Sequence, residues 1–171
     1  MTLFGTSIYG RTVTPTFDLL DPKMVRVYDD QVKMAAVAKR GVPVAMSLRT
    51  WNQETAARVL KALPAGSTLS IKHEPEDDVA AGSLTLETWR SWQLALVEAI
   101  KVSGRAGEVF PATILMGWTL DPHSGRSWFD YLTAEVIAAL KSLPGAIAGW
   151  DNYVGPKQGG PDGPTLTAEQ V

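Results

Sequence analysis

Acidic, basic and aromatic side chains gather directly after the apolar runs of this 171-residue sequence. In chain order they are Tyr9 and Arg11; Tyr28, Asp29 and Asp30; Arg49 and Trp51; His73, Glu74 and Glu76; Trp118, Asp121 and His123; and Trp150, Asp151, Asn152 and Tyr153. Aromatic rings stack on the C–H faces of sugars, while acids and amides hydrogen-bond to hydroxyls. The set therefore indicates a site for a neutral polyhydroxylated ligand. Taken singly, each residue is equally well explained by a loop that faces water.

The densest group of such residues is the run SIKHEPEDD at 70–78. Glu74 stands before a proline, which restricts the backbone where the strand ends. Because successive side chains of a strand alternate, His73 is expected to point to the opposite side from Glu74. Glu74 and Glu76 would lie on one face about 6.5 Å apart, so they cannot flank a glycosidic bond from both sides. A second catalytic acid has to come from another strand.

Structural roles for the same pair stay open. Glu74 could cap the strand exit, or pair with Lys72 or Arg49. His73 could be a hydrogen-bonded support that orients Glu74 from beneath the site.

The composition excludes several kinds of site. With no cysteine, disulfides, thiolate zinc sites and cysteine nucleophiles are ruled out. His73 and His123 are the only histidines, too few for a histidine-rich metal site. A divalent-ion site made of Glu74, Glu76 and Asp78 has the oxygens but not EF-hand spacing, and a solvated acidic turn is the simpler interpretation. We predict no metal and no cofactor.

Charge and hydropathy exclude further classes. Sixteen Lys and Arg against 18 Asp and Glu give a net charge of -2, so no basic field is available for nucleic acid or anionic lipid. The N-terminal run MTLFGTSIYGR lacks a basic segment and a long apolar segment. The uncharged stretch VFPATILMGWTL is far shorter than the about 20 residues of a membrane span. We expect neither a signal peptide nor a membrane segment.

Six short apolar runs predict strands that are buried on both faces of a parallel sheet. They cover residues 3–9, 24–28, 42–48, 68–73, 109–118 and 146–153. Helical periodicity follows between them at 31–40, 53–63, 86–103 and 130–143, and each segment ends at Gly or Pro. Thr85 is the expected N-cap of the third helix, where Trp89 and Trp92 are expected to pack rather than to bind. Strand and helix alternation predicts an α/β fold with right-handed crossovers.

The unit count favours a barrel. A (β/α)₈ barrel uses about 30 residues per unit, so this chain would hold five to six units. We predict an incomplete (β/α) barrel of about six units over residues 1–153, then a Gly/Pro-rich tail at 154–171 leading to a missing C-terminal part. An open doubly wound sheet is the alternative, although no GxGxxG or GxxxxGK[ST] run follows any strand.

The uncharged first and sixth strands would leave open edges, so self-association is expected.

A family resemblance sharpens this interpretation. The run IKHEPED at 71–77, a Trp-bearing helix, Asp121-Pro122 and the run GWDNY at 149–153 closely resemble the glycosyl-hydrolase-like barrel proteins of actinobacteria and their phages. These are related to the mannanase-type family twenty-six of retaining glycoside hydrolases. The resemblance implies cleavage of O-glycosidic bonds in a polysaccharide such as a β-mannan or β-glucan. It also implies Glu74 as general acid/base, and an extracellular or virion-associated protein.

The strand ends and the resemblance together define the predicted substrate site. Its residues are Tyr9, Tyr28, Arg49, His73, Trp118, Asp121, Trp150, Asp151 and Tyr153. Burial in an aromatic-lined cleft is expected to raise the pKa of Glu74 toward the value that an acid needs near neutral pH.

The sequence departs from the family at the nucleophile. In the family that residue is a Glu at the end of the seventh strand, and the chain ends before any such run. Asp162 and Glu169 follow Asp151, but neither stands on a predicted strand. A retaining mechanism needs two carboxyls about 5–5.5 Å apart, so residues 1–171 are expected not to hydrolyse glycosides alone. The alternative function is a non-catalytic carbohydrate-binding or structural barrel fragment of a virion or cell surface.

Overall fold

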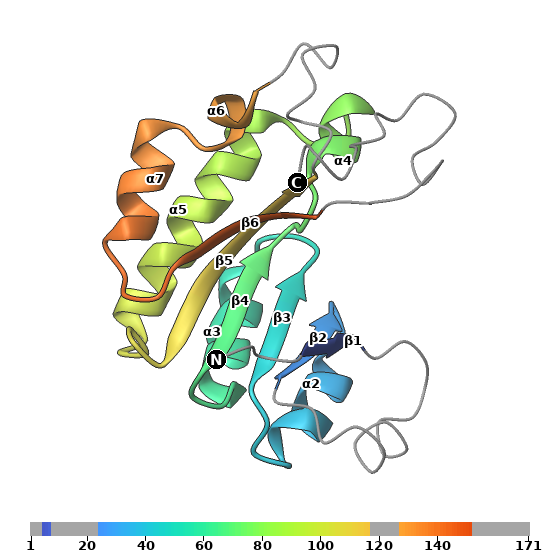
Figure 1. Cartoon of the computed structure of the whole chain (residues 1–171), viewed down its shortest axis with the longest axis vertical. Coiled ribbons are helices and arrows are strands. Elements are labelled where there is room, and N and C mark those ends of the chain that lie inside the picture. The colour runs from blue at the N-terminus through green and yellow to red at the C-terminus, as the bar shows by residue number, and fades with distance from the viewer. Residues whose placement is uncertain (1–4, 8–23, 117–126, 152–171) are drawn as a thin grey trace, which may run out of the picture.

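The computed structural model describes residues 5–7, 24–116 and 127–151 (Figure 1). Its six strands are β1 Gly5–Ser7, β2 Met24–Tyr28, β3 Val44–Leu48, β4 Ser67–Ile71, β5 Val109–Met116 and β6 Ile147–Asp151. They form one sheet in chain order, and every neighbouring pair is parallel. The predicted parallel α/β class is confirmed. β1 and β6 are the ends of this described sheet, and self-association through them stays a prediction.

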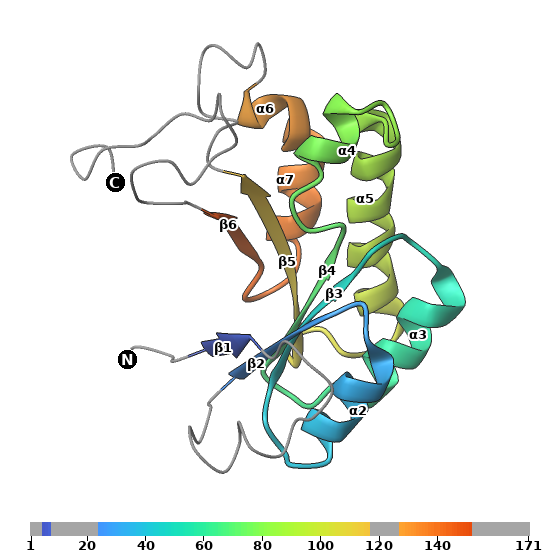
Figure 2. The ribbon, with the colours of Figure 1, turned by 90° about the vertical axis from the view of Figure 1, so that its right-hand side faces the viewer.

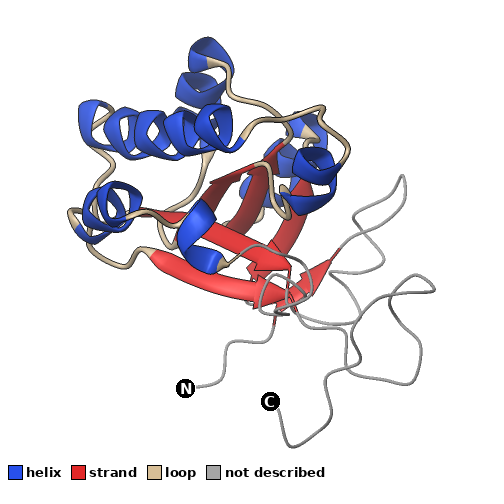
Figure 3. Ribbon diagram, turned by 90° about the horizontal axis from the view of Figure 1, so that it is seen from above, coloured by secondary structure: helices blue, strands red, loops and turns tan. Residues whose placement is uncertain are grey.

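The helices connect successive strands and form a layer of their own. They are α2 Gln31–Ala38, α3 Gln53–Ala62, α4 Glu76–Ala80, α5 Leu86–Val102, α6 Trp128–Tyr131 and α7 Ala134–Lys141. α2 packs on α3, α3 on α5, and α5 on α7, so the helices follow each other in chain order as the strands do. Figures 2 and 3 show them along one side of the strands. None of the helices described is long and apolar enough to cross a bilayer.

The core lies between the sheet and these helices. Its strand members include Val25, Val27, Val44, Met46, Leu48, Leu69 and Ile71, and its helix members include Val59, Leu60, Trp89, Leu96 and Ile100. Gln93 is a polar residue buried within it. Its amide nitrogen donates to the carbonyl of Ile71 at 3.1 Å, and its amide oxygen accepts from the hydroxyl of Thr113 at 3.1 Å. These bonds tie α5 to both β4 and β5.

The helix ends follow local chemistry. The hydroxyl of Thr85 accepts from the amide of Thr88 at 3.1 Å, so the predicted N-cap of α5 is confirmed. Asp30 caps α2 in the same way through the amide of Lys33. The predicted helix at 130–143 is in fact two, because the chain leaves helical geometry at Leu132 and Thr133 caps a new helix.

Two predictions about the segment at the end of β4 are wrong. β4 ends at Ile71, two residues before the predicted end, because Lys72 has a φ of 47° and leaves the extended conformation. The acidic stretch that follows forms α4 rather than a solvated turn. Both differences concern the segment that carries Glu74.

Candidate functional site

The parallel sheet brings the predicted site residues to a single edge. Tyr28 ends β2, Arg49 follows β3, Glu74 follows β4, and Asp151 ends β6. Since all strands run the same way, these positions share the carboxyl edge of the sheet, where α/β proteins place their ligands. The expectation that Glu74 and Asp151 lie at the same end of the sheet is confirmed for the backbone.

Several predicted residues have no described side chain. Tyr9, Trp118, Asp121 and Tyr153 lie outside the described residues, as do Arg11 and His123. Trp150 and Asp151 belong to β6, and their backbone alone is described. Their role in substrate binding stays a prediction.

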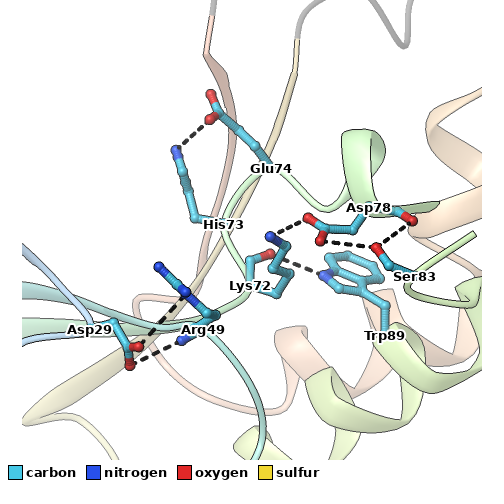
Figure 4. Close-up of polar contacts among 8 residues, drawn as sticks. All are labelled: Asp29, Arg49, Lys72, His73, Glu74, Asp78, Ser83 and Trp89. Atoms are coloured by element: carbon cyan, nitrogen blue, oxygen red, sulfur yellow. Dashed lines mark hydrogen bonds and ion pairs between the residues drawn. The ribbon is translucent and has the colours of Figure 1, made fainter. Parts of the chain in front are cut away.

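His73 and Glu74 meet each other after the end of β4 (Figure 4). The imidazole Nε2 lies 3.4 Å from Oε2 of Glu74, and the two side chains are 4% and 21% exposed. Our expectation of opposite directions is therefore wrong. Alternation holds only within a strand, whereas Lys72 and Glu74 both adopt left-handed backbone, with φ of 47° and 51°. The result agrees with the alternative in which His73 supports Glu74.

Arg26 is a member of this cluster that the sequence analysis did not include. Its Nη2 hydrogen-bonds to Nε2 of His73, across 47 residues of sequence. A guanidinium can only donate, so Nε2 accepts in this contact and the imidazole proton then lies on Nδ1. The signal was visible in MVRVY at 24–28, where Arg26 is the one charged residue inside an apolar strand.

The backbone around Glu74 is held from two sides. The amide of Glu74 donates to the carbonyl of Ile114 on β5 at 3.1 Å. The indole Nε1 of Trp89 on α5 donates to the carbonyl of Lys72 at 3.2 Å (Figure 4). Trp89 is 1% exposed, so its predicted packing role is confirmed. These bonds fix a turn whose left-handed residues are unfavourable on their own.

The side chain of Lys72 adds a third link to this turn. It forms an ion pair with Asp78 on α4, and the hydroxyl of Ser83 donates to Oδ1 of Asp78 at 3.2 Å. The hydrogen bond from Lys72, with help from its charge, holds the pKa of Asp78 below its ordinary value against the opposing effect of burial. Lys72 is thus bound to Asp78 rather than to Glu74.

The acidic residues after Glu74 separate in space. Glu76 is fully buried at 0% exposure, whereas Asp77 is exposed to water. The interpretation of Glu76 as part of a solvated turn is wrong, because the start of α4 carries it into the interior. No group of three His, Asp or Glu residues within the described ranges could hold a metal ion.

Arg49 and Tyr28 are open to solvent. The Arg49 side chain is 69% exposed, and its Nε lies 3.9 Å from Oδ2 of Asp29. The amide of Arg49 also donates to Oδ1 of Asp29 at 3.3 Å. Tyr28 is 40% exposed. Both side chains are therefore accessible, their role in substrate binding stays a prediction, and Arg49 pairs with Asp29 rather than with Glu74.

Comparisons with protein-family models, with curated proteins and with solved structures found no match.

Proposed function

We propose that this chain is a glycoside-hydrolase-like protein that binds an oligo- or polysaccharide at the carboxyl edge of its sheet. Glu74 is the carboxyl that exchanges a proton with the glycosidic oxygen. The observation that carries the proposal is the contact between Glu74 and His73 at this edge. A carboxyl that is 21% exposed is shielded from bulk water yet still open to a ligand.

The strand order supports a barrel-type arrangement. Chain-order parallel strands with helices on one side are the pattern of a singly wound (β/α) barrel, whereas a doubly wound sheet reverses its order at a switch point. In a barrel, the carboxyl ends of different strands surround one pocket. We therefore propose that the described strands β1 to β6 form the larger part of such a barrel wall.

His73 lies between Arg26 and Glu74. Its Nε2 accepts from Arg26, and the same nitrogen lies 3.4 Å from Oε2 of Glu74. The Arg26–His73 pair thus holds the imidazole beside the Glu74 carboxyl, and a group that transfers a proton needs such a defined position.

A second candidate is a carbohydrate-binding protein without hydrolytic activity. Retaining hydrolysis needs another carboxyl about 5–5.5 Å away. The acids nearest in sequence do not supply it, because Glu76 is fully buried and Asp78 is bound by Lys72. Aromatic and hydroxyl-bonding side chains at the edge would still bind sugar.

Hydrolysis and binding assays on Glu74→Gln separate these functions. Residues 1–171 alone are expected to bind the glycan without cleaving it. In any form of the protein in which a second carboxyl completes the pair, we expect cleavage of an aryl glycoside with a poor leaving group, and Glu74→Gln should lose about 10²–10⁴-fold in rate while its sugar affinity is kept. The matched control is Asp77→Asn, which removes an exposed carboxylate three residues away. A fluorinated activated sugar, followed by mass spectrometry, identifies any carboxyl that acts as nucleophile.

The outcomes distinguish the alternatives. Full activity in Glu74→Gln excludes Glu74 as the proton donor. Sugar binding without hydrolysis in a form that has a second carboxyl favours the binding protein. Neither binding nor hydrolysis across β-mannan, β-glucan and their oligosaccharides overturns the carbohydrate proposal.

A further inference from the structure

A groove with a volume of about 290 Å³ lies at the carboxyl edge, beside the turn that carries Glu74. Its walls come from the ends of β2, β3 and β4, from α4 and the loop after it, and from α5. They are formed by Tyr28, Arg49, Thr50, Lys72, Asp78, Ser83, Leu84 and Trp92. Small-molecule sites span about 300–1,000 Å³, so this groove fits one monosaccharide unit better than a longer chain.

The charged residues of the groove differ in how closely they are paired. Lys72 and Asp78 neutralise each other in an ion pair, and their side chains are 16% and 36% exposed. Arg49 differs, because its guanidinium is 69% exposed and its contact with Asp29 is long, at 3.9 Å. A surface pair of this kind contributes little stability. The Arg49 fork is therefore ready to exchange Asp29 for an anionic ligand.

The ligand anion is best matched by a carboxylate. Guanidinium binds carboxylate through two parallel hydrogen bonds, which adds both strength and orientation. The group that Arg49 contacts in the structure is itself a carboxylate, that of Asp29, so a ligand carboxylate would replace a group of the same kind.

The remaining lining suits the body of a sugar. Tyr28 and the half-buried Trp92 provide aromatic surface, and the hydroxyls of Thr50 and Ser83 can bond to sugar hydroxyls. Trp92 packs against the core, as predicted, and its remaining surface also lines the groove.

We infer that this groove is a binding subsite for a pyranose that carries a carboxylate, such as a uronic acid unit, with Arg49 as the residue that recognises the carboxylate. Lys72 lines the groove and stands two residues before Glu74, so the groove adjoins the turn that carries the proposed catalytic carboxyl. The inference rests on the proposed function for its place in a glycan chain. Binding of the single sugar does not depend on hydrolysis.

The test is a titration of the whole chain with sodium glucuronate, followed by ¹H–¹⁵N correlation spectra. We expect saturable shifts at the backbone amides of Arg49, Thr50 and Ser83 and at the indole N–H of Trp92. Glucose should bind at least about ten-fold more weakly, since it lacks the charged acceptor. Inorganic phosphate at the same concentration should not displace glucuronate.

Arginine variants identify the recognising residue. Arg49→Ala should weaken glucuronate binding by about 10-fold to 100-fold, and Arg49→Lys should restore only part of the loss because an ammonium cannot form the bidentate pair. Arg58→Ala is the matched control. Arg58 is an exposed arginine on α3 that does not line the groove, so its loss should leave the affinity unchanged.

Three results would overturn the inference. They are no saturable shift with glucuronate, equal binding of glucose, and full affinity in Arg49→Ala. Displacement by phosphate would show a general anion site instead. Glu74→Gln makes the two proposals distinguishable, because it removes the proposed proton donor, which does not line the groove, and should leave glucuronate binding intact.

Discussion

The imidazole Nε2 of His73 lies 3.4 Å from the carboxylate Oε2 of Glu74, although the two residues are neighbours in the chain. In an extended strand they would point to opposite faces. They meet because the two residues that flank His73 leave β geometry. Lys72 has a φ of 47°, and Glu74 has a φ of 51°. The position of the proposed catalytic carboxyl thus depends on strained backbone.

This strain predicts an unusual ranking of substitutions at position 74. Glu74→Gly should be more stable than Glu74→Ala by about 1 kcal/mol, because both lose the His73 contact and only alanine keeps the left-handed penalty. Urea denaturation followed by circular dichroism measures the difference. The control is Asp77, inside α4, where Asp77→Ala should be more stable than Asp77→Gly by about 1 kcal/mol. The same preference for alanine at both positions would contradict the strain.

Gly145 is predicted to tolerate no side chain. It has a φ of 70°, and an added Cβ would lie 2.5 Å from a ring carbon of Phe110. Gly145→Ala should therefore destabilise by about 2–4 kcal/mol, from the left-handed penalty together with overpacking. Gly41 has a similar φ of 72° with nothing near its Cβ position, so Gly41→Ala should show the backbone penalty of about 1–2 kcal/mol alone. Equal losses in thermal unfolding would argue against the Phe110 contact.

The Gln93 bonds predict strong coupling between α5 and β5. Gln93→Leu should destabilise by about 2–3 kcal/mol, because it leaves both the Ile71 carbonyl and the Thr113 hydroxyl buried without their partner. Adding Thr113→Val removes one of these orphaned groups. The double variant should then lose clearly less than the sum of the two single losses in a double-mutant cycle. Simple additivity would show that the Thr113 bond contributes nothing.

Asp78 is predicted to contribute to stability in a pH-dependent manner. Its pKa is lowered, first by the hydrogen bond from Lys72, so its ionised form is favoured in the folded state. A lowered carboxyl pKa stabilises the fold above the unfolded value and loses that contribution as the pH falls below about 4. Asp78→Asn should lower the unfolding free energy by about 0.2–1 kcal/mol at pH 7 and flatten its decline below pH 4.

The control for this pH dependence is Asp77→Asn on the same helix, which removes an exposed carboxylate and leaves the Lys72–Asp78 pair in place. Asp30 also has a lowered pKa, through the amide of Lys33 that it caps, but it is present in all of these proteins and cancels in the comparison. Identical curves for wild type and Asp78→Asn would refute the contribution.

The sequence by itself determined the parallel α/β class and most element positions. β2 matches the predicted 24–28, and α5 covers 86–102 against a predicted 86–103. These predictions succeed because buried strands and amphipathic helices are set by local hydrophobic pattern and by caps such as Thr85. The common edge of Tyr28, Arg49 and Glu74 followed from the same pattern, since parallel strands place their carboxyl ends together.

Only the tertiary structure decided how the side chains at that edge meet. The contact of Arg26 with His73 spans 47 residues, and the left-handed turn at 72–74 is held by Trp89 and Ile114 from other elements. Glu76 is buried and Asp77 is exposed although both are acids of one short run. Local propensity carries no information on such contacts, because their free energy comes from partners that folding brings together from distant parts of the chain.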